Sequence, residues 1–293
     1  MSAKHPVIAV TGSSGSGTTT VKRAFEHIFR RENLQALVVE GDSFHSLDRK
    51  AFKAAVNTAE KTGTVAPSHF GPEANHFDLI EKCFKDYSSK GECQRRYYLH
   101  NDEEARPFKQ ESGTFTPWEK VGKGADILFY EGLHGGVVSG KVDAAKHVDL
   151  LVGVVPIVNL EWIQKIHRDA AERGYSPDVI VETILRRMPD YVHYITPQFS
   201  RTHINFQRVP TVDTSNPFIA RDIPTPDESF VVIHFSNPIR DKVDFPYLLN
   251  MIHDSFMSRP NTIVVPGGKM GFAMEVIITP MIHDLVDRKK KAK

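Results

Sequence analysis

A glycine-rich loop between an apolar strand and a helix constrains this sequence most strongly. Val7–Thr11 is apolar and rich in β-branched residues, and a helical pattern begins at Thr18. Glycines let the backbone curl and point its N–H groups inward, and the positive end of the following helix adds to their attraction for anions. This order predicts a phosphate-binding loop made of Gly12, Ser13, Ser14, Gly15, Ser16, Gly17, Thr18, Thr19 and Thr20.

Short β-branched runs alternate with helical patterns along the rest of the chain, which predicts parallel strands joined by crossover helices. We expect strands at Val7–Thr11, Ala36–Glu40, Ile127–Glu131, Leu150–Pro156, Phe230–Phe235 and Thr262–Pro266. We expect helices at Thr18–Arg30, Asn75–Asp86, Leu160–Arg173, Pro177–Tyr194 and Met270–Lys290. The fold class is therefore α/β, with a sheet flanked by helices.

The 293 residues fit a single domain of this class. The polar stretch of about 44–117 lacks strand signals until Arg96–Leu99, so we expect a substrate-covering insertion there and not a second domain. The basic end, Arg288–Lys293, is most simply a frayed, solvated helix end, with an anion-binding tail as the alternative.

Charge and composition exclude several classes of protein. The chain has 37 basic and 36 acidic residues, so it lacks the overall basic field of a dedicated nucleic-acid binder. No run approaches the roughly 18 apolar residues of a membrane span, and the first residues contain no hydrophobic signal core. Because Cys83 and Cys93 are the only cysteines, we expect a cytoplasmic protein. From the balanced charge and the short apolar runs we expect no nucleic-acid or membrane partners.

The loop departs from the common G-x-x-x-x-G-K-[ST] pattern, because position 18 is Thr where that pattern has Lys. A cation from elsewhere would have to replace this lysine. Lys165, Arg168 and Asp169 share one helix face directly after the predicted strand Leu150–Pro156. A solvated, salt-bridged surface is the alternative for this group.

Two predicted strands end in acids. Asp42 follows Ala36–Glu40, and Glu131 ends its own strand. In open α/β sheets ligands bind beyond the carboxyl ends of the strands, so these acids are candidates for Mg²⁺ binding, and Asp42 for a general base. The hydroxyl of a threonine at the end of the loop can also bind Mg²⁺. For either acid alone, a capping or turn carboxylate is the alternative.

Basic residues gather near the same strand ends: His45, Arg49, His100 and His134. Together they favour a site for an anionic, hydroxyl-rich substrate, although a single histidine at such a position is more often structural. None of these residues has the close spacing of a zinc site.

The phosphate loop together with four further segments resembles the bacterial phosphoribulokinases of the phosphoribulokinase/uridine kinase family. The further segments are Glu40–His45, Phe129–Gly135, Asn159–Asp169 and Ile204–Phe218, and the resemblance extends over essentially the whole chain. It implies a P-loop NTPase-like mixed, mostly parallel sheet similar to that of nucleoside monophosphate kinases. It also implies Mg²⁺-dependent phosphorylation of D-ribulose 5-phosphate by ATP, which gives ribulose 1,5-bisphosphate in the Calvin cycle.

The resemblance also implies individual roles. Asp42 corresponds to the catalytic base, Asp169 to a second essential acid near Mg²⁺, and Glu131 to the metal-side acid, with Thr19 beside them. Lys165 and Arg168 correspond to the cations that stabilise the transition state. The implied sugar-phosphate-binding residues are His45, Arg49, Tyr98, His100, His134 and Arg173.

Regulation and assembly follow from the same resemblance. The bacterial enzymes are typically homo-octamers that NADH activates and AMP inhibits, and Arg31, Arg186 and Arg187 correspond to effector-related arginines. His234 stands where a related activated enzyme has arginine.

Two other functions remain open at this point. Another small-molecule kinase, closest to uridine kinase, is the first, but an uncharged acceptor would not need Arg49, Arg173 and Arg186. A nucleotide-sensing subunit without catalysis is the second, but such a subunit would not need Asp42 and Asp169.

Overall fold

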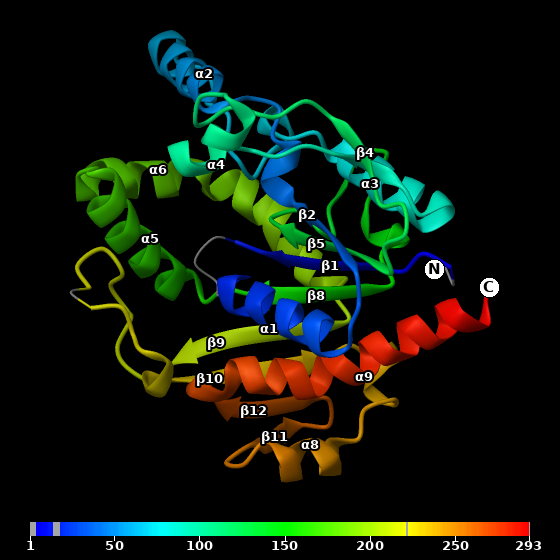
Figure 1. Ribbon diagram of the computed structural model, residues 1–293. Helices are drawn as coiled ribbons and strands as arrows, with labels where there is room; N and C mark the ends of the chain where they lie inside the picture. Colours follow the sequence, from blue (N-terminus) through cyan, green and yellow to red (C-terminus); the bar gives the residue numbers. More distant parts are fainter. Residues whose placement is uncertain (1–3, 14–17, 221, 293) are drawn as a thin grey trace.

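The computed structural model describes residues 4–13, 18–220 and 222–292, without the side chains of residues 18, 19, 172 and 173 (Figure 1). Its main element is an eight-stranded sheet in the order β11-β12-β10-β9-β8-β1-β5-β2. The strands are β1 (Val7–Gly12), β2 (Ala36–Glu40), β5 (Ile127–Gly132), β8 (Leu150–Val155), β9 (Ile204–Pro210), β10 (Ser229–Phe235), β11 (Phe256–Arg259) and β12 (Thr262–Pro266).

The sheet has a parallel half and an antiparallel half. Strands β2, β5, β1, β8 and β9 pair in parallel, and β9, β10, β12 and β11 continue the sheet in antiparallel pairs. Strand β1 lies inside the parallel half, where Val10 pairs with Glu131 of β5 and with Val152 of β8. The predicted mixed, mostly parallel sheet is thereby confirmed.

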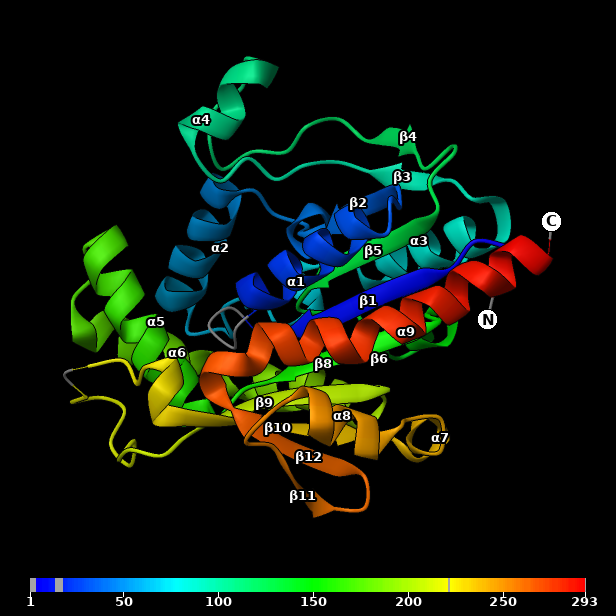
Figure 2. The same cartoon turned by 60° about the horizontal axis from the view of Figure 1, so that its bottom comes forward.

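Helices cover both faces of this sheet (Figures 1 and 2). They are α1 (Thr18–Arg31), α2 (Arg49–Thr62), α3 (Phe77–Lys90), α4 (Asp102–Ala105), α5 (Val158–Arg173), α6 (Pro177–Asp190), α7 (Asn237–Arg240), α8 (Phe245–Met251) and α9 (Met270–Lys291). Two short two-stranded sheets lie outside the main sheet, β3 (Cys93–Arg95) with β4 (Glu119–Val121), and β6 (Val138–Ser139) with β7 (Val142–Asp143).

The two faces of β1 contribute to two separate cores. Ile8 and Val10 pack in a cluster with residues of α1, α8 and α9, whereas Val7 and Ala9 pack in a cluster with residues of α3. Successive side chains of a strand point to opposite faces, so a strand buried on both faces must be apolar throughout. This requirement explains the uninterrupted apolar run at Val7–Val10, all of which is fully buried.

Most of the predicted elements are present with shifted ends, but several elements were missed, among them the short helices α4, α7 and α8 and the short strands β3, β4, β6 and β7. Strands β9 and β11 were not predicted as strands, and neither was helix α2 as a helix. The predicted strand signal at Arg96–Leu99 was wrong: the strand β3 ends at Arg95, and Tyr98 forms only an isolated bridge with Phe115.

The stretch 44–117 does not stand apart from the sheet as a whole. Helix α3 packs its buried residues Ile80, Phe84 and Tyr87 against the sheet, which makes it one of the flanking helices. An insertion over the substrate can therefore comprise only the rest of the stretch, which includes α2 and α4.

The basic C-terminal helix end is not fully solvated as expected. Lys289 is buried, and its ammonium group donates to the backbone oxygens of Ala125 and Asp126 and to the Asp126 carboxylate. Within the described ranges, none of the helices combines the length and the apolar character that a membrane crossing requires.

We predict that Gly153→Ala destabilises the protein by about 1–3 kcal/mol, the usual cost of overpacking. A Cβ atom at this position of β8 would lie 2.1 Å from Asn205 Oδ1 and 3.0 Å from Thr202 Cγ2. Urea denaturation followed by circular dichroism measures the loss. Gly271→Ala in α9 is the matched control, because the nearest atom to its Cβ would be Thr20 Cγ2 at 4.0 Å. Equal losses in both variants would contradict this account.

Candidate active site

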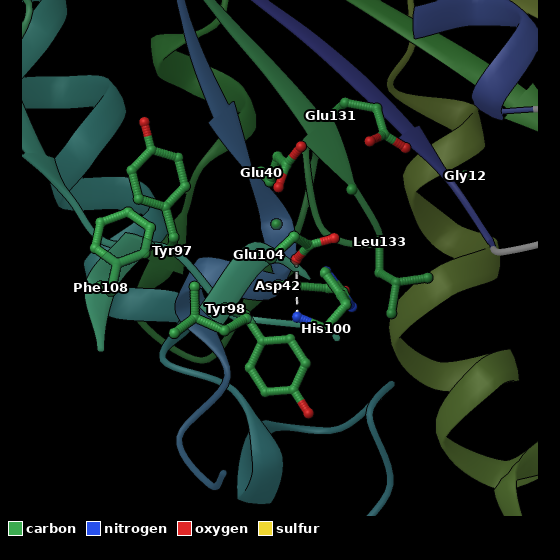
Figure 3. Close-up of a pocket in the computed structure, with 13 residues that line it drawn as sticks. Gly12, Glu40, Asp42, Tyr97, Tyr98, His100, Glu104, Phe108, Glu131 and Leu133 are labelled. Atoms are coloured by element: carbon green, nitrogen blue, oxygen red, sulfur yellow. Dashed lines mark hydrogen bonds and ion pairs between the residues drawn. The ribbon is translucent and has the colours of Figure 1, made fainter. Parts of the chain in front are cut away.

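A cavity of about 610 Å³ opens at the carboxyl ends of β1, β2 and β5 (Figure 3). Parallel strands place their carboxyl ends at one edge of the sheet, so residues distant in sequence meet there. The described residues that line it are Gly12, Glu40, Gly41, Asp42, Tyr97, Tyr98, Leu99, His100, Glu104, Phe108, Glu131, Gly132 and Leu133.

Two glycines in contact allow the ends of β2 and β5 to approach. A Cβ atom on Gly41 would lie 2.9 Å from the Cα of Gly132, and one on Gly132 would lie 2.7 Å from the Cα of Gly41. The hydroxyl of the fully buried Tyr130 lies beside both positions, 2.7 and 2.8 Å from these Cβ atoms. Only glycine fits at either place without displacing its neighbours.

Asp42 is held by histidines at the edge of this cavity. It lies in the short 3₁₀ turn that follows β2, and its side chain is 41% exposed. Its Oδ1 is 3.2 Å from His45 Nε2, and its Oδ2 is 3.6 Å from His100 Nε2. Its position below the protein surface raises the pKa of the carboxyl, but the hydrogen bond from His45 and the charges of His45, His100 and His69 lower this pKa to about 2. Asp42 is therefore ionised at neutral pH.

Two other acids of the cavity, Glu40 and Glu131, face a lysine. Lys22 of α1 donates to Glu40 at 2.7 Å, and Glu131 lies within electrostatic range of the same ammonium. Partial burial lowers the pKa of Lys22, but the bond with Glu40 and the charges of Glu40 and Glu131 raise it above its usual value. Lys22 lies one helical turn after position 18, where the common phosphate loop has its lysine.

The segment after β3 supplies the wall opposite the strand ends. The rings of Tyr98 and His100 pack edge to face at 4.9 Å, and both residues line the cavity. Arg49, the first residue of α2, donates to the carbonyl oxygen of His100 at 2.6 Å, which ties α2 to this wall. The structure thus brings four of the predicted substrate residues close to Asp42: His45, Arg49, Tyr98 and His100.

His134, a fifth predicted substrate residue, lies within electrostatic range of Asp42 and His45 but is not among the residues that line the cavity. It is buried, and its Nε2–H donates to the carbonyl oxygen of Phe70 at 3.0 Å. Burial lowers the pKa of His134 to about 3, so the ring is neutral. Its ring packs at 4.7 Å from Phe77 at the start of α3. These contacts join the loop after β5 to the start of α3, and the role of His134 in substrate binding stays a prediction.

The cations of α5 surround a buried acid. The ammonium of Lys165 donates to Asp169 Oδ2, and the guanidinium of Arg168 donates to Asp169 Oδ1 from Nη2 at 3.1 Å. The Asp169 side chain is only 4% exposed. Burial lowers the pKa of Lys165, and the charges of Arg187 and Arg168 act in the same direction against the opposing effect of Asp169. In this arrangement Asp169 is the counter-ion of both predicted transition-state cations.

A second acid of the same helix contacts the phosphate loop. Glu161 is buried, and it accepts hydrogen bonds from the hydroxyls of Ser13 and of Tyr191, the latter at 3.1 Å. Burial raises the pKa of Glu161 to about 7, although these bonds and the charges of Lys165 and Arg168 oppose it. The first turns of α5 are therefore fixed beside the start of the loop.

Several predicted site residues lie partly or wholly outside the described atoms. Residues 14–17 and the side chains of Thr18, Thr19 and Arg173 are not described. Among the residues that are described, no group of three or more His, Cys, Asp or Glu side chains could hold a metal ion. Of the predicted metal ligands, Glu131 lines the cavity, and Asp169 is paired within α5 with Lys165 and Arg168.

The predicted effector arginines lie in two places. Arg31 at the end of α1 donates to Glu275 at 3.2 Å and to Thr279 at 2.7 Å, both in α9. Arg186 and Arg187 belong to α6, and Arg187 lies within electrostatic range of Lys165. Within one chain the three arginines do not form a common site.

Sequence reasoning missed five residues that shape the site: Lys22, His69, Asn75, Tyr191 and Glu161. Lys22 could have been found as a basic residue one turn into the helix after the loop. Glu161 falls within a segment that was singled out for its cations. His69, Asn75 and Tyr191 act through tertiary contacts that no spacing in the sequence indicates.

The chain is similar in sequence to one protein family and to several known proteins. A family profile described as "Phosphoribulokinase / Uridine kinase family" matches residues 7–215. The chromosomal phosphoribulokinase of Cupriavidus necator is 60% identical over 292 residues, which cover 100% of this chain and 99% of that protein. The phosphoribulokinase of Sinorhizobium medicae is 57% identical over 291 residues, with 99% of each chain covered.

A solved structure agrees with these sequence relatives. The phosphoribulokinase from Rhodobacter spheroides superimposes with a TM-score of 0.90 at 52% identity, and the match covers 99% of this chain and 100% of that one. Fold, sequence and site agree over the full length. The chain is a kinase, and it belongs to the phosphoribulokinase/uridine kinase family.

Proposed function

We propose that this enzyme transfers the γ-phosphoryl group of ATP to a hydroxyl of D-ribulose 5-phosphate, which gives ADP and ribulose 1,5-bisphosphate for the Calvin cycle. The observation that carries the proposal is the ionised Asp42, held by His45 at the wall of a cavity beyond the phosphate-loop strand. The name and high identity of the full-length relatives support the same substrate.

Asp42 is the general base of the proposed reaction. Its carboxylate accepts the proton of the substrate hydroxyl while the hydroxyl oxygen bonds to the γ-phosphorus, and the bond from that phosphorus to the β–γ bridging oxygen breaks. Oδ1 is engaged by His45 at 3.2 Å, whereas Oδ2 has the looser contact with His100 at 3.6 Å, so Oδ2 is the oxygen more available to the substrate. His100 and Tyr98 lie beside it, where they can position the sugar. The terminal phosphate of the sugar would bind the nearby basic groups, which include Arg49.

Binding of ATP uses the loop and the cations of α5. The backbone of Gly12–Thr20 would bind the phosphates. Lys165 and Arg168 lie within electrostatic range of Glu161, which accepts a hydrogen bond from Ser13. They are thus near the phosphate loop, and we propose that they stabilise the charge that develops on the transferred group.

The carboxylates present fit a magnesium ion. Mg²⁺ in kinases typically binds one or two carboxylates together with substrate phosphates. Glu131 offers an oxygen ligand at the cavity wall, and the family resemblance adds the hydroxyl of Thr19, so these two residues would hold the ion. The ion, when bound, neutralises charge on the phosphates. Asp169 would join them only after exchanging its partners Lys165 and Arg168.

Effector binding and assembly remain predictions from the family resemblance. An anionic effector such as AMP or NADH would have to compete with Glu275 for Arg31. The homo-octamer, the NADH activation and the AMP inhibition are each open to direct measurement.

A coupled assay of ADP release tests the proposed substrate. We expect turnover with ribulose 5-phosphate and little with uridine or fructose 6-phosphate at the same concentration. Preference for uridine would overturn the proposal in favour of a nucleoside kinase. Absence of turnover with any acceptor, while ATP still binds, would favour a nucleotide-sensing subunit.

We predict that Asp42→Asn lowers kcat at least ~100-fold while ATP still binds, because an amide cannot accept the proton. Steady-state kinetics and a nucleotide-binding titration measure the two effects. Asp48→Asn is the matched control, since Asp48 caps α2 outside the cavity and asparagine caps equally well. Activity of Asp42→Asn within tenfold of the unmodified enzyme would remove Asp42 from the chemistry.

We also predict that Lys165→Met lowers kcat by ~10³–10⁵-fold, the range measured when a cation is removed from a transferring phosphoryl group. ATP affinity should change far less, because the loop amides remain. Lys82→Met is the control, because Lys82 forms the same i,i+4 pair with Asp86 on the exposed face of α3. Parallel losses of rate and ATP affinity would make Lys165 a binding residue only, and Arg168 or Arg173 the next candidate.

A further inference from the structure

The side-chain amide of Asn75 has an orientation that its neighbours determine. One end of the amide, Nδ2, lies 2.9 Å from the carbonyl oxygen of His69 and 2.7 Å from that of Gly71. Carbonyl oxygens only accept hydrogen bonds, so this end must be the NH₂ group, which donates to both. The oxygen Oδ1 therefore points the other way, and it lies 2.7 Å from Nδ1 of His45.

This orientation determines where the protons of His45 lie. Because Asn75 Oδ1 can only accept, His45 Nδ1 carries a proton and donates it. Nε2, on the other side of the ring, faces Oδ1 of Asp42 at 3.2 Å. An ionised carboxylate also only accepts, so Nε2 must carry a proton as well. With both nitrogens protonated, the ring is an imidazolium cation.

The backbone holds the same pair together. His45 and Asn75 form an isolated antiparallel bridge, in which His76 N donates to Phe44 O at 2.8 Å and Ser46 N donates to Ala74 O at 2.9 Å. The relative position of the two side chains thus does not depend on the side-chain bond alone.

Charged groups from several elements surround the His45 ring. Burial of the ring lowers its pKa, and so does the charge of Arg96, whose guanidinium donates to the carbonyl oxygens of Ser43 and His45. The hydrogen bond with Asp42, the negative charge of Asp42 and the hydrogen bond with Asn75 raise the pKa of His45. These effects outweigh the opposing ones, so the pKa of His45 lies above its usual value. The other groups that face the ring are His69 at 4.7 Å, Tyr98 at 6.2 Å and the neutral His134.

We propose that Asn75 is a positioning residue that holds His45 as a cation, so that Asp42 is bonded through Oδ1 and presents Oδ2 to the substrate hydroxyl. The proposal rests on the proposed function, because it assumes that Asp42 is the base. Asn75 acts on the base through His45 and has no contact with the substrate assigned to it.

The sign of the pH dependence follows from the geometry. His45 is charged below its pKa and neutral above it. As the pH rises through that pKa, the ring loses its positive charge. Its bond to the carboxylate of Asp42 then changes from an ion pair to a weaker neutral contact, and Asp42 is held less firmly. We therefore expect kcat to fall on the alkaline side of the pH profile.

Nitrogen NMR of the whole enzyme with ¹⁵N-labelled histidine tests the proton positions without any change at Asn75. The His45→Gln variant identifies the His45 signals by their loss. We expect both ring nitrogens of His45 to be protonated at pH 7 in the free enzyme. A neutral His45 ring at that pH would overturn the proposal.

Two substitutions then separate positioning from a structural role. Asn75→Leu and Asn75→Asp both lose the bonds to the carbonyls of His69 and Gly71, but only Asn75→Asp keeps an acceptor for His45. We expect the His45 pKa and the alkaline limb of kcat to move down by about one pH unit in Asn75→Leu. In Asn75→Asp both should stay or move up. Equal shifts in the two variants would make Asn75 merely structural.

A double substitution closes the test. In the His45→Gln background, adding Asn75→Leu should lower kcat by less than twofold, because its path to Asp42 is already absent. A further tenfold fall would show that Asn75 acts by another route and would overturn the proposal. Failure of the proposed base is distinguishable, because it would appear as activity of Asp42→Asn and leave the NMR spectrum of the free enzyme unaffected.

Discussion

The parallel pairing of β1 on both of its sides is the constraint on which the site depends. Because β5 and β8 run in the same direction as β1, and β2 in the same direction as β5, their carboxyl ends lie at one edge of the sheet. The phosphate loop, Asp42, Glu131 and helix α5 all follow these four ends. A reversal of any one strand would move its functional residue to the opposite edge, where it could contribute nothing.

The strand order also separates the chemical roles. The loop follows β1, with the cavity and its base beyond β5 and β2 on one side and the cations of α5 beyond β8 on the other. In this arrangement the opposite charges neutralise one another locally: Asp42 faces His45, Glu40 faces Lys22, and Asp169 faces Lys165. Under the proposed function, the phosphates of ATP would enter between the two sides. Their negative charge would then replace that of Asp169 as the partner of Lys165 and Arg168.

Sequence patterns predicted the parts of this molecule whose physics is local. The runs at Ala36–Glu40 and Thr262–Pro266 became strands with those same ends. Thr262–Pro266 is buried on both faces, which demands apolar residues, whereas the edge strand Ala36–Glu40 is fully buried on one face only. Strand β9 was missed because it is not a continuous apolar run and begins beside the helical turns that follow α6, although the alternation of Ile204 and Phe206 with Asn205 and Gln207 is itself a strand signal.

The site divides in the same way. Asp42, His45 and His100 could be predicted from strand ends and from the family motifs, and the structure places them together. His134 has the same sequence signal, but it is buried and neutral, because whether a histidine after a strand faces a cavity depends on the packing of α3. Asn75 carried no signal at all, since its role arises from a bridge to a residue 30 positions earlier.

The contact between Gly41 and Gly132 has a consequence for how such an enzyme can diverge. Each glycine excludes a side chain at the other, and Tyr130 occupies the space beside both. A new side chain at either position would require simultaneous changes at the others, so single substitutions cannot reshape this part of the wall. New acceptor specificity is more accessible through Tyr97 and Tyr98 in the loop of Tyr97–Leu99, because these two side chains line the cavity and are only partly buried. Relatives that act on different acceptors should therefore keep both glycines and differ in that loop.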